Sequence, residues 1–574
     1  MMNKISETKT IEEDGLVISE DRKVLLGVCD SSIMSINIPD GIEVVGEDAF
    51  NGCGLLREVH LPKTVKSIGI SAFQECKYLN KINLPDGLKE IGDWAFFCCT
   101  FLNSVVIPPT VMRIGEFAFA DCSSLEEIVL PQDLCSLGDA AFDHCTSLKK
   151  LVVPGSVKAL DLSSFDYCKS IKAIVFNEGL ESLDGGFLHE FKSVRSLCLP
   201  NSLRRVDGHS FSGFVNLKEI RLLPDNPHFK FVDGALYSID LKRLIRVLPL
   251  TKGNFSLPQG VIEIDGLAFQ DCKYITKIHI PDSVKRIGSF AFERCVSLKE
   301  IILPRKLKKI EEFTFMDCKE LREVNIPDSV SVIQRHAFWH CNSLTEMRLP
   351  YSLTTIGVMA FPYHIRNFSI DSKNKKFAII DGVLYNKDVT ELISVPMSIE
   401  IKHFIIPDTV RKIRMYAFNG CDHIESITLP EGLLEIGAST FRNCESLDTI
   451  TLPEGITKIP EGAFGECWSL REVSLPQSLK KIDNWAFLCC GSLKSITIPE
   501  SVKSIEEYSL PSTIKEVHVS YNNPREAAKV FRLIKESEYS DDYRFRLFVP
   551  RGTKANYLGN GLFANWLTIK EDHN

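Results

Sequence analysis

Apolar and polar residues follow one pattern that returns at a fixed interval along this chain. The stretch KINLPDGLKEIGDWAFFCC (81–99) recurs as KIHIPDSVKRIGSFAFERC (277–295) and, more loosely, as SITIPESVKSIEEYSL (495–510). Most copies follow the form L-x-x-I-x-L-P-x-x-V/L-x-x-I-G-x-x-A-F-x-x-C. A regular period of about 23 residues predicts a solenoid in which each repeat forms one coil.

Within each repeat, the pattern predicts a short strand, a corner and an extended return. Leu79, Ile82 and Leu84 have the spacing of the inward-pointing residues of a strand. The proline that follows ends the strand, because it lacks the N–H that a sheet ladder needs. After the return, an Ala-Phe pair predicts one helical or 3₁₀ turn with the phenylalanine as a plug. Since single coils leave their apolar edges open, they stack, and their strands form a parallel sheet about 4.8 Å apart.

The period is interrupted twice by texts that resemble each other. NPHFKFVDGALYSIDLKRLIRVLP (226–249) and NKKFAIIDGVLYNKDVTELISVP (374–396) each predict two strands around a turn, a β-hairpin. EDGLVISEDRKVLLGV (13–28) is a third version, placed where it would shield the first coil. Two interpretations of the hairpins stay open: a structural module that caps or bends the solenoid, and a flap that holds a ligand.

After residue 519 the period is lost. NNPREAAKVFRLIKESE (522–538) predicts a helix with Pro524 in its first turn, and YRFRLFVP (543–550) predicts a strand. The predicted organisation is an amino-terminal hairpin cap (1–32), repeat blocks at 33–224, 258–370 and 407–519, hairpin insertions at 225–257 and 371–406, and a carboxy-terminal cap (520–574).

Composition narrows the class of protein. The 574 residues are 44% hydrophobic and 25% charged, with a net charge of −8. A nucleic-acid binder usually carries a basic surplus, so we expect no nucleic-acid partner. No segment approaches the run of about 18 apolar residues that a membrane span needs, and the amino terminus lacks an apolar run typical of a signal peptide. We therefore expect no membrane span and a cytoplasmic location.

The unit IPDSVKRIGSFAFERCVSLKEIILP (280–304) resembles the repeat of BspA-like leucine-rich repeat proteins, and the resemblance covers most of residues 33 to 519. It implies an α/β repeat fold: a leucine-rich-repeat solenoid with a parallel β-sheet on the concave face and short helical or 3₁₀ turns opposite. It also implies a protein that binds host or matrix proteins without enzymatic activity in its repeats. A cell-surface or secreted location, which is usual in that family, is the alternative to the cytoplasm.

Fourteen of the nineteen cysteines occupy one position of the repeat. A metal ribbon or a disulfide ladder would need a thiolate or thiol at that position in every coil. The same position holds Phe191, Phe214 and His364 in other coils, so it accepts apolar volume. We predict buried, free, structural thiols and no metal or other cofactor. Unpaired thiols fit a reducing compartment better than an oxidising one.

The sequence contains only weak matches to motifs for metal or cofactor binding. HAFWH places His336 and His340 four residues apart, which on a helix would offer two metal ligands, but no third ligand has an evident spacing. GNGLFA (559–564) imitates a dinucleotide-binding turn without the surrounding β-α-β unit. We therefore expect no catalytic residues and no enzyme.

The most informative surface is a row of residues that point away from the core, one from each strand, directly after the inward isoleucine. Thr and Ser dominate this row in the last block, where strand propensity and solubility explain them. On five consecutive coils the row is apolar, and we call this segment the valine row. Its members are Val106, Val129, Val152, Val175 and Cys198. Contiguous exposed apolar surface often marks an interaction site, whereas strand propensity alone is the competing explanation.

The function predicted from the sequence is a non-catalytic scaffold that binds a protein, or alternatively a glycan, along the concave sheet, with the valine row as candidate contact surface. Two other classes stay open. One is an enzyme with its site in a hairpin or in the carboxy-terminal cap, and the other is a structural rod that associates with itself.

Overall fold

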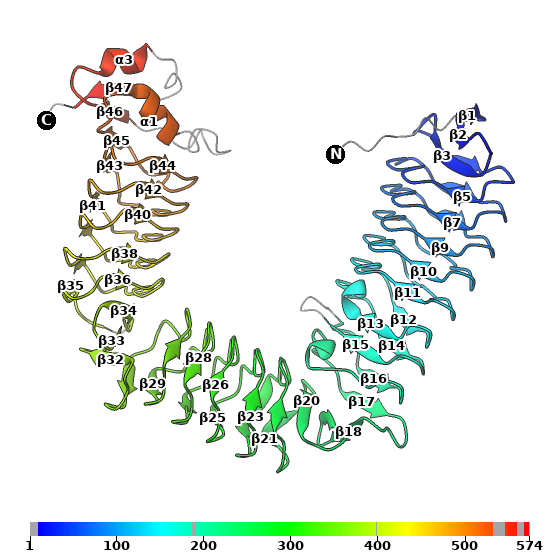
Figure 1. Cartoon of the computed structure of the whole chain (residues 1–574), viewed down its shortest axis with the longest axis horizontal. Coiled ribbons are helices and arrows are strands. Elements are labelled where there is room, and N and C mark those ends of the chain that lie inside the picture. Colours follow the sequence, from blue (N-terminus) through cyan, green and yellow to red (C-terminus); the bar gives the residue numbers. More distant parts are fainter. Residues whose placement is uncertain (1–9, 186–190, 398, 532–545, 560–567, 573–574) are drawn as a thin grey trace. The chain divides into compact units, whose positions relative to one another are not determined.

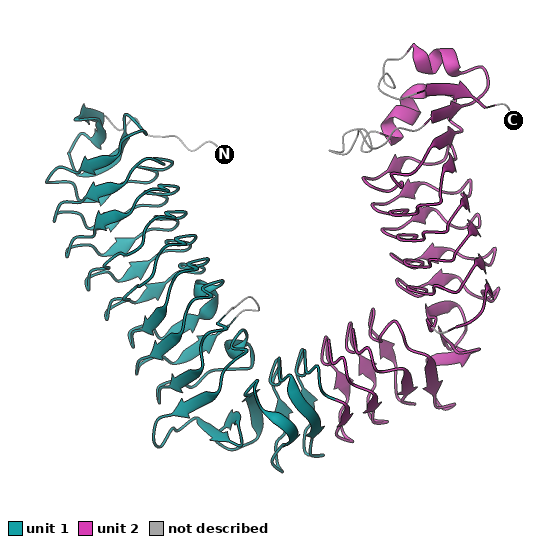
Figure 2. Cartoon of the chain, turned by 180° about the vertical axis from the view of Figure 1, so that it is seen from behind, with its two compact units in different colours: residues 1–298 teal, residues 299–574 magenta. Residues whose placement is uncertain are grey.

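The computed structural model describes residues 10–185, 191–397, 399–531, 546–559 and 568–572. It divides into two compact units, residues 1–298 and 299–574, drawn in teal and magenta in Figure 2. In both units each repeat forms one flattened coil, and successive coils stack through short parallel strands (Figure 1). The parallel solenoid predicted from the period is thereby confirmed.

The predicted strand of each repeat forms what we call the first ladder. Its outward and inward residues alternate, as in Lys81–Asn83, where only Ile82 is buried. In unit 1 the ladder consists of β4 (Ser35–Asn37), β6 (Glu58–His60), β8 (Lys81–Asn83), β12 (Lys150–Val153), β14 (Ala173–Phe176), β16 (Ser196–Leu199), β17 (Glu219–Leu222), β21 (Lys252–Ser256) and β23 (Tyr274–His279). In unit 2 it consists of β25 (Glu300–Ile302), β27 (Glu323–Asn325), β29 (Glu346–Leu349), β31 (Asn367–Ile370), β35 (His403–Ile405), β37 (Ser426–Thr428), β39 (Thr449–Thr451), β41 (Glu472–Ser474), β43 (Ser495–Ile498) and β45 (Glu516–Val519).

The return of each coil, expected only to be extended, forms a second parallel ladder. Its strands are two or three residues long, and all but β11 bury an isoleucine, valine or leucine, as β7 and β9 bury Ile68 and Ile91 where they pair. In unit 1 these are β5 (Val44–Val45), β7 (Ser67–Ile68), β9 (Glu90–Ile91), β10 (Arg113–Ile114), β11 (Ser136–Leu137), β13 (Ala159–Asp161), β15 (Ser182–Asp184), β22 (Glu263–Ile264) and β24 (Arg286–Ile287). In unit 2 they are β26 (Lys309–Ile310), β28 (Val332–Ile333), β30 (Thr355–Ile356), β36 (Lys412–Ile413), β38 (Glu435–Ile436), β40 (Lys458–Ile459), β42 (Lys481–Ile482) and β44 (Ser504–Ile505).

The Ala-Phe segment is helical in only two coils of the described chain, as the 3₁₀ turns η1 (Leu162–Phe165) and η2 (His209–Phe211). Elsewhere it is a tight turn that contains left-handed residues, such as Trp94 (φ 59°) and Cys98 (φ 60°). In this turn the N–H groups of Trp94, Phe96 and Cys98 donate to carbonyls of the next coil at 2.7–2.9 Å. Hydrogen bonds between coils therefore alternate with i to i+3 bonds inside the turn, such as that from the N–H of Phe97 to the carbonyl of Trp94 at 3.0 Å. The bonds between coils offset the cost of left-handed backbone at residues other than glycine.

Stacked phenylalanines fill the interior. The ring of Phe96 lies 5.2 Å from that of Phe73 and 5.0 Å from that of Phe119, with interplanar angles of 7° and 9°. The cysteine position is next to this stack: the Sγ of Cys122 donates to the carbonyl oxygen of Phe96 at 3.2 Å, and most other coils repeat this bond. The carbonyl of Phe96 also accepts the N–H of Cys99 at 3.1 Å, so the thiol is a second donor to the same oxygen. The cysteine therefore supplies a hydrogen bond between coils in addition to the apolar volume that the sequence suggested.

All fourteen cysteines at this position are buried, as predicted. Burial disfavours the charged thiolate and raises the pKa of Cys421 and Cys490 to about 12. These thiols therefore stay protonated at neutral pH, which is the form that can donate to a carbonyl.

The two insertions and the amino-terminal segment are three-stranded antiparallel meanders rather than two-stranded hairpins. They comprise β1 (Thr10–Glu13), β2 (Leu16–Ser19) and β3 (Val24–Val28); β18 (Phe229–Val232), β19 (Ala235–Ser238) and β20 (Arg243–Val247); and β32 (Phe377–Ile380), β33 (Val383–Asn386) and β34 (Glu391–Ser394). Each first turn is an Asp-Gly pair with positive φ at both residues, as at Asp233 and Gly234, the conformation that a two-residue hairpin loop needs. The third strand of each meander pairs in parallel with a strand of the second ladder, so a meander takes the place of one coil's return.

An arginine connects each inserted meander to the neighbouring coils through an ion pair and a hydrogen bond to a backbone carbonyl. In unit 1 Arg243 of β20 binds both carboxylate oxygens of Asp265, at 2.6 and 2.7 Å, and the carbonyl of Val206 in the coil before the meander. In unit 2 the two charged residues are exchanged between these positions, so that the acid lies on the meander and the arginine lies after it. Arg414 follows the meander, binds Glu391 of β34 and reaches back to the carbonyl of Ile356 at 3.0 Å.

The carboxy-terminal region extends the first ladder. Helix α1 (Pro524–Val530) begins at the proline as the sequence predicts, with Asn523 as its cap. Strands β46 (Arg546–Val549) and β47 (Thr568–Glu571) continue the parallel sheet beyond β45, and the short helix α3 (Lys554–Leu558) lies between them in sequence. Most of the second half of the predicted helix, and most of GNGLFA, lie outside the described residues.

The phenylalanine stack predicts the effect of a truncation. Phe119 is fully buried between Phe96 and Phe142, so Phe119→Ala removes contacts on both sides and should cost about 3–5 kcal/mol. Because coils contact only their neighbours, hydrogen exchange should accelerate around residues 96–145 and little elsewhere. Phe101→Ala, at a ring that is 53% exposed, is the matched control and should change exchange slightly. Unchanged exchange at residues 96–145 in Phe119→Ala would contradict the stack.

The thiols predict a labelling pattern. At pH 8 an alkylating reagent should modify native Cys29, Cys135, Cys198 and Cys489, which are exposed, and the half-buried Cys98 more slowly. The fourteen buried thiols should react only after denaturation, because they are inaccessible to the reagent and because burial raises the pKa of thiols such as Cys421 and Cys490. Denaturation without reductant should bring the count to nineteen. A lower count would mean that some of the thiols are oxidised or metal-bound.

Candidate functional site: the valine row of the first ladder

The valine row lies on the outward face of the first ladder in unit 1. Val106 is 83% exposed, Val129 69% and Val175 40%, while Cys198 is exposed and Val152 is half-buried. The inward neighbours Ile128 and Leu130 are buried, so alternation along the strand places the two sets of side chains on opposite faces. The predicted orientation is therefore confirmed for all five residues, and the structure does not test their role.

Strand register aligns these side chains from coil to coil. Val152 of β12 is the direct partner of Val175 in β14, and the two strands are parallel. The coils that carry Val106 and Val129 are joined by single bridges, Ser104 to Glu127 and Glu127 to Lys150, rather than by full strand pairs. A row of apolar side chains at the spacing of parallel strands, about 4.8 Å, results.

Basic side chains accompany the row. Lys150 lies two residues before Val152 on the same strand face, and the exposed Lys172 and Arg195 come directly before β14 and β16. Lys149 is paired with Glu126 of the preceding coil. On the preceding coil, the exposed Glu127 occupies the position equivalent to Lys150, so the flank is acidic beside Val129 and basic beside Val152, Val175 and Cys198.

Outward positions of the other described coils are mostly polar. Thr428, Thr451 and Ser474 are exposed, as expected for solubilising strand residues. In unit 2, however, Ile302 is 56% exposed and Ile405 72%. Sequence reasoning missed Ile405, although it lies one full repeat before Thr428 and so has the same phase in the pattern.

Ionisable groups do not converge on the valine row. Among the residues that the structure describes, no group of three or more His, Cys, Asp or Glu side chains is arranged to hold a metal ion. His336 and His340 of HAFWH lie in a tight turn with left-handed backbone, where His336 stacks on Phe313 at 4.8 Å. Burial raises the pKa of Asp265 to about 6. Arg243 binds both carboxylate oxygens of Asp265, so this carboxylate helps to connect the inserted meander to its neighbouring coils.

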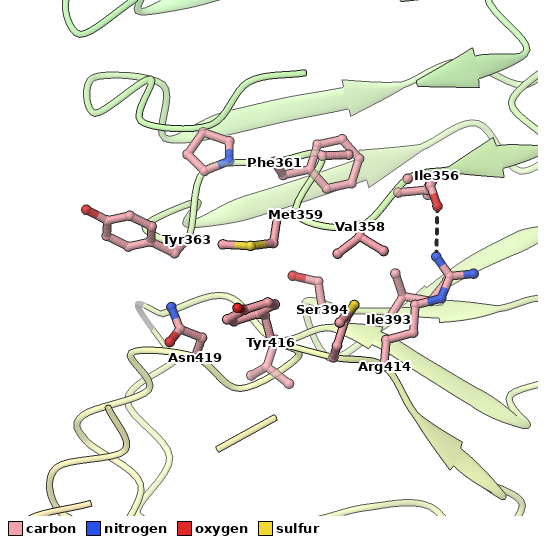
Figure 3. Close-up of a pocket in the computed structure, with 15 residues that line it drawn as sticks. Ile356, Val358, Met359, Phe361, Tyr363, Ile393, Ser394, Arg414, Tyr416 and Asn419 are labelled. Atoms are coloured by element: carbon pink, nitrogen blue, oxygen red, sulfur yellow. Dashed lines mark hydrogen bonds between the residues drawn. The ribbon is translucent and has the colours of Figure 1, made fainter. Parts of the chain in front are cut away.

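A second feature, absent from the sequence predictions, is a cavity in unit 2 beside the inserted meander. Figure 3 shows Met359 and Phe361 on one wall, Ile393 and Ser394 of β34 at the centre, and Tyr416 opposite. The cavity has a volume of about 60 Å³. Its lining comes from segments separated by the insertion, so no local motif could reveal it.

The cavity adjoins a larger groove of about 760 Å³. The two share Met359, Tyr363, Tyr416 and Asn419, and the groove adds His336, Trp339, His340, Asp422 and Glu445. Aromatic rings and carboxylates therefore surround the entrance to the cavity.

Comparison with known proteins identifies the family. The family model described as BspA type leucine rich repeat region (6 copies) matches residues 28–149, 112–232, 251–376 and 397–515. These matches cover well over half of the chain, which therefore belongs to the BspA-type leucine-rich repeat family. The matches skip residues 233–250 and 377–396, which lie in the two inserted meanders.

Solved structures of bacterial leucine-rich repeat proteins are similar to this chain. TpLRR of T. pallidum is 33% identical over 28% of this chain and 78% of its own, with a TM-score of 0.27. A Bacteroides ovatus leucine-rich repeat protein is 21% identical over 91% and 100%, with a TM-score of 0.32. The pneumococcal vaccine antigen PcpA is 16% identical over 99% of both chains, with a TM-score of 0.33. Comparison with curated proteins gives no match.

The described helices are all short, and none has the length and apolar content that crossing a bilayer requires.

Proposed function

We propose that this protein is a non-catalytic scaffold that binds another protein through the valine row. The observation that carries the proposal is the exposure of apolar side chains on consecutive coils, with Val106 and Val129 each more than two thirds exposed. Removing such a stripe from water favours association, and monomeric proteins rarely leave contiguous apolar surface uncovered. Membership of a leucine-rich repeat family supports an interaction role in general.

The flanking charges favour one kind of partner. Lys150, Lys172 and Arg195 form a positive margin beside Val152, Val175 and Cys198. The complementary surface therefore has an apolar centre with acidic residues at its rim beside these three residues. Valine side chains offer no hydrogen bonds, which favours a protein over a glycan as the occupant of this row. The nineteen thiols favour an encounter in a reducing compartment.

A pair of matched double variants tests this function. Val129→Glu with Val152→Glu places unpaired charge in the apolar stripe and leaves the inward Leu125, Ile128 and Leu130 unchanged, so the coils should remain folded. Affinity for a partner recovered with the wild-type chain should fall at least tenfold.

Thr451→Glu with Ser474→Glu is the control on exposed positions of the same phase in unit 2, and it should bind as the wild type does. Equal losses in the two variants, or full affinity in the valine variant, would refute recognition by the valine row. Circular dichroism of each variant separates lost binding from lost folding.

A further inference from the structure

The two inserted meanders join their coils in the same way, which allows a residue-by-residue comparison. In unit 1 the N–H of Val247 donates to the carbonyl of Ala268 at 2.8 Å, and in unit 2 Val395 donates to Ala417 at 2.8 Å. The registers also agree, since Leu244 pairs with Ile264 and Leu392 with Ile413. Arg246 and Ser394, each one residue before the donating valine, are therefore equivalent positions.

In unit 1 this position is an arginine, and its guanidinium group fills the junction, by which we mean the region where the meander meets the neighbouring coils. Arg246 is only 1% exposed, and it donates one N–H to the carbonyl of Leu267 and another to the carbonyl of Gln270 at 3.1 Å. Burial lowers the pKa of Arg246, and the negative charges of Asp271 and Glu293 oppose this shift. The junction thus contains a binding site for a guanidinium, occupied by the chain's own side chain.

In unit 2 the acceptors remain but the guanidinium is gone. The carbonyls equivalent to those of Leu267 and Gln270 belong to Tyr416 and Asn419, and both residues line the cavity together with Ser394. Among the described residues, the Asn419 carbonyl accepts no hydrogen bond from a side chain. A backbone acceptor beside an open cavity is free to bind a donor from outside.

Two glycines of the unit 1 junction are replaced by larger residues in unit 2. In unit 1 Gly208 approaches Gly266 so closely that a Cβ on Gly208 would overlap the carbonyl oxygen of Gly266. The equivalent residues of unit 2 are Val358 and Met415, which line the cavity. The unit 2 cavity is therefore lined by larger side chains at the two glycine positions and by a smaller one, Ser394, at the position of Arg246.

The charges of unit 2 are compatible with a cation in this space. Arg414 is neutralised by Glu391, and the equivalent pair of Arg243 and Asp265 accompanies Arg246 in unit 1. Arg442 is likewise paired with Glu466.

The adjoining groove contributes the remaining groups for a cation. It presents Asp422 and Glu445 together with the rings of Trp339 and Tyr363. Carboxylates attract a guanidinium, and aromatic faces stack on it. Because the groove is open, a ligand entering from it keeps part of its hydration and needs fewer buried acids than Arg246 does.

We propose that the cavity of unit 2 binds the guanidinium of an arginine side chain of a partner polypeptide, in the place that Arg246 fills in unit 1. The carbonyls of Tyr416 and Asn419 accept its N–H groups, and the groove holds the flanking chain of the partner. This site is independent of the valine row, because it lies in the other unit and uses none of its residues.

The test uses the full chain labelled at its methionine methyl groups, with N-acetyl-arginine methylamide as the probe. Met359 and Met415 line the cavity, so their resonances should shift on titration, whereas exposed Met34 of unit 1 should not. The citrulline analogue has nearly the same shape without the charge and should bind at least tenfold more weakly. Equal binding of the two probes, or no shift of Met359 and Met415, would overturn the proposal.

A variant makes the comparison with unit 1 direct. Ser394→Arg supplies the side chain that fills the first junction, so Met359 and Met415 should stop responding to the probe. Their resonances should lie near those of the saturated wild type. Thr451→Arg adds the same charge on an exposed strand position and should bind as the wild type does. A folded Ser394→Arg that still binds the probe would overturn the proposal, and if it does not fold, the arginine and citrulline titrations of the wild type decide alone.

Discussion

Stacking of equivalent residues from coil to coil is the constraint on which the rest of this structure depends. A single coil cannot cover its own edges, so each buried group must find its partner in the coil above or below. The phenylalanine rings meet at 5.0–5.3 Å through the coils of residues 50–165, and a cysteine thiol donates to a phenylalanine carbonyl in the same columns. The turn backbone adopts left-handed conformations because its N–H groups bind the next coil. These interactions fix the inward residues and leave the outward ones free to vary.

That freedom explains where candidate binding surfaces arise. On the first ladder, the position after the inward isoleucine can be valine, threonine or arginine without disturbing the core, and in unit 1 a stretch of it is apolar. At the meanders, equivalent positions can exchange an arginine for a serine, or a pair of glycines for valine and methionine, while the backbone hydrogen bonds persist. Each surface therefore results from substitutions at positions that the stack does not use.

The sequence predicted the elements that repeat and missed those that depend on geometry between coils. The period located the first-ladder strands, the phenylalanine core and the buried cysteines, because each repeats its residue type at a fixed phase. The second ladder was not predicted, because strands such as Ser67–Ile68 are too short to show an alternating pattern of apolar and polar residues. The left-handed turns and the thiol hydrogen bonds arise from contacts with the next coil, and the third meander strand pairs with residues beyond the insertion. The outward direction of Val129 followed from alternation, whereas the cavity beside Ser394 is lined by segments that are distant in sequence.

Removal of one whole coil tests the central claim most directly. Deleting residues 97–119 joins Phe96 to Ala120 and keeps the A-F-x-x-C pattern in phase, so every remaining coil still meets an equivalent neighbour. The account predicts that this variant folds cooperatively, with the circular dichroism of the parent and a melting temperature within a few degrees of it. Deleting residues 97–107, less than one coil, shifts the phase of all later contacts in the unit and should abolish cooperative unfolding there. Equal damage from the two deletions would contradict the claim that stacking in register holds the protein together.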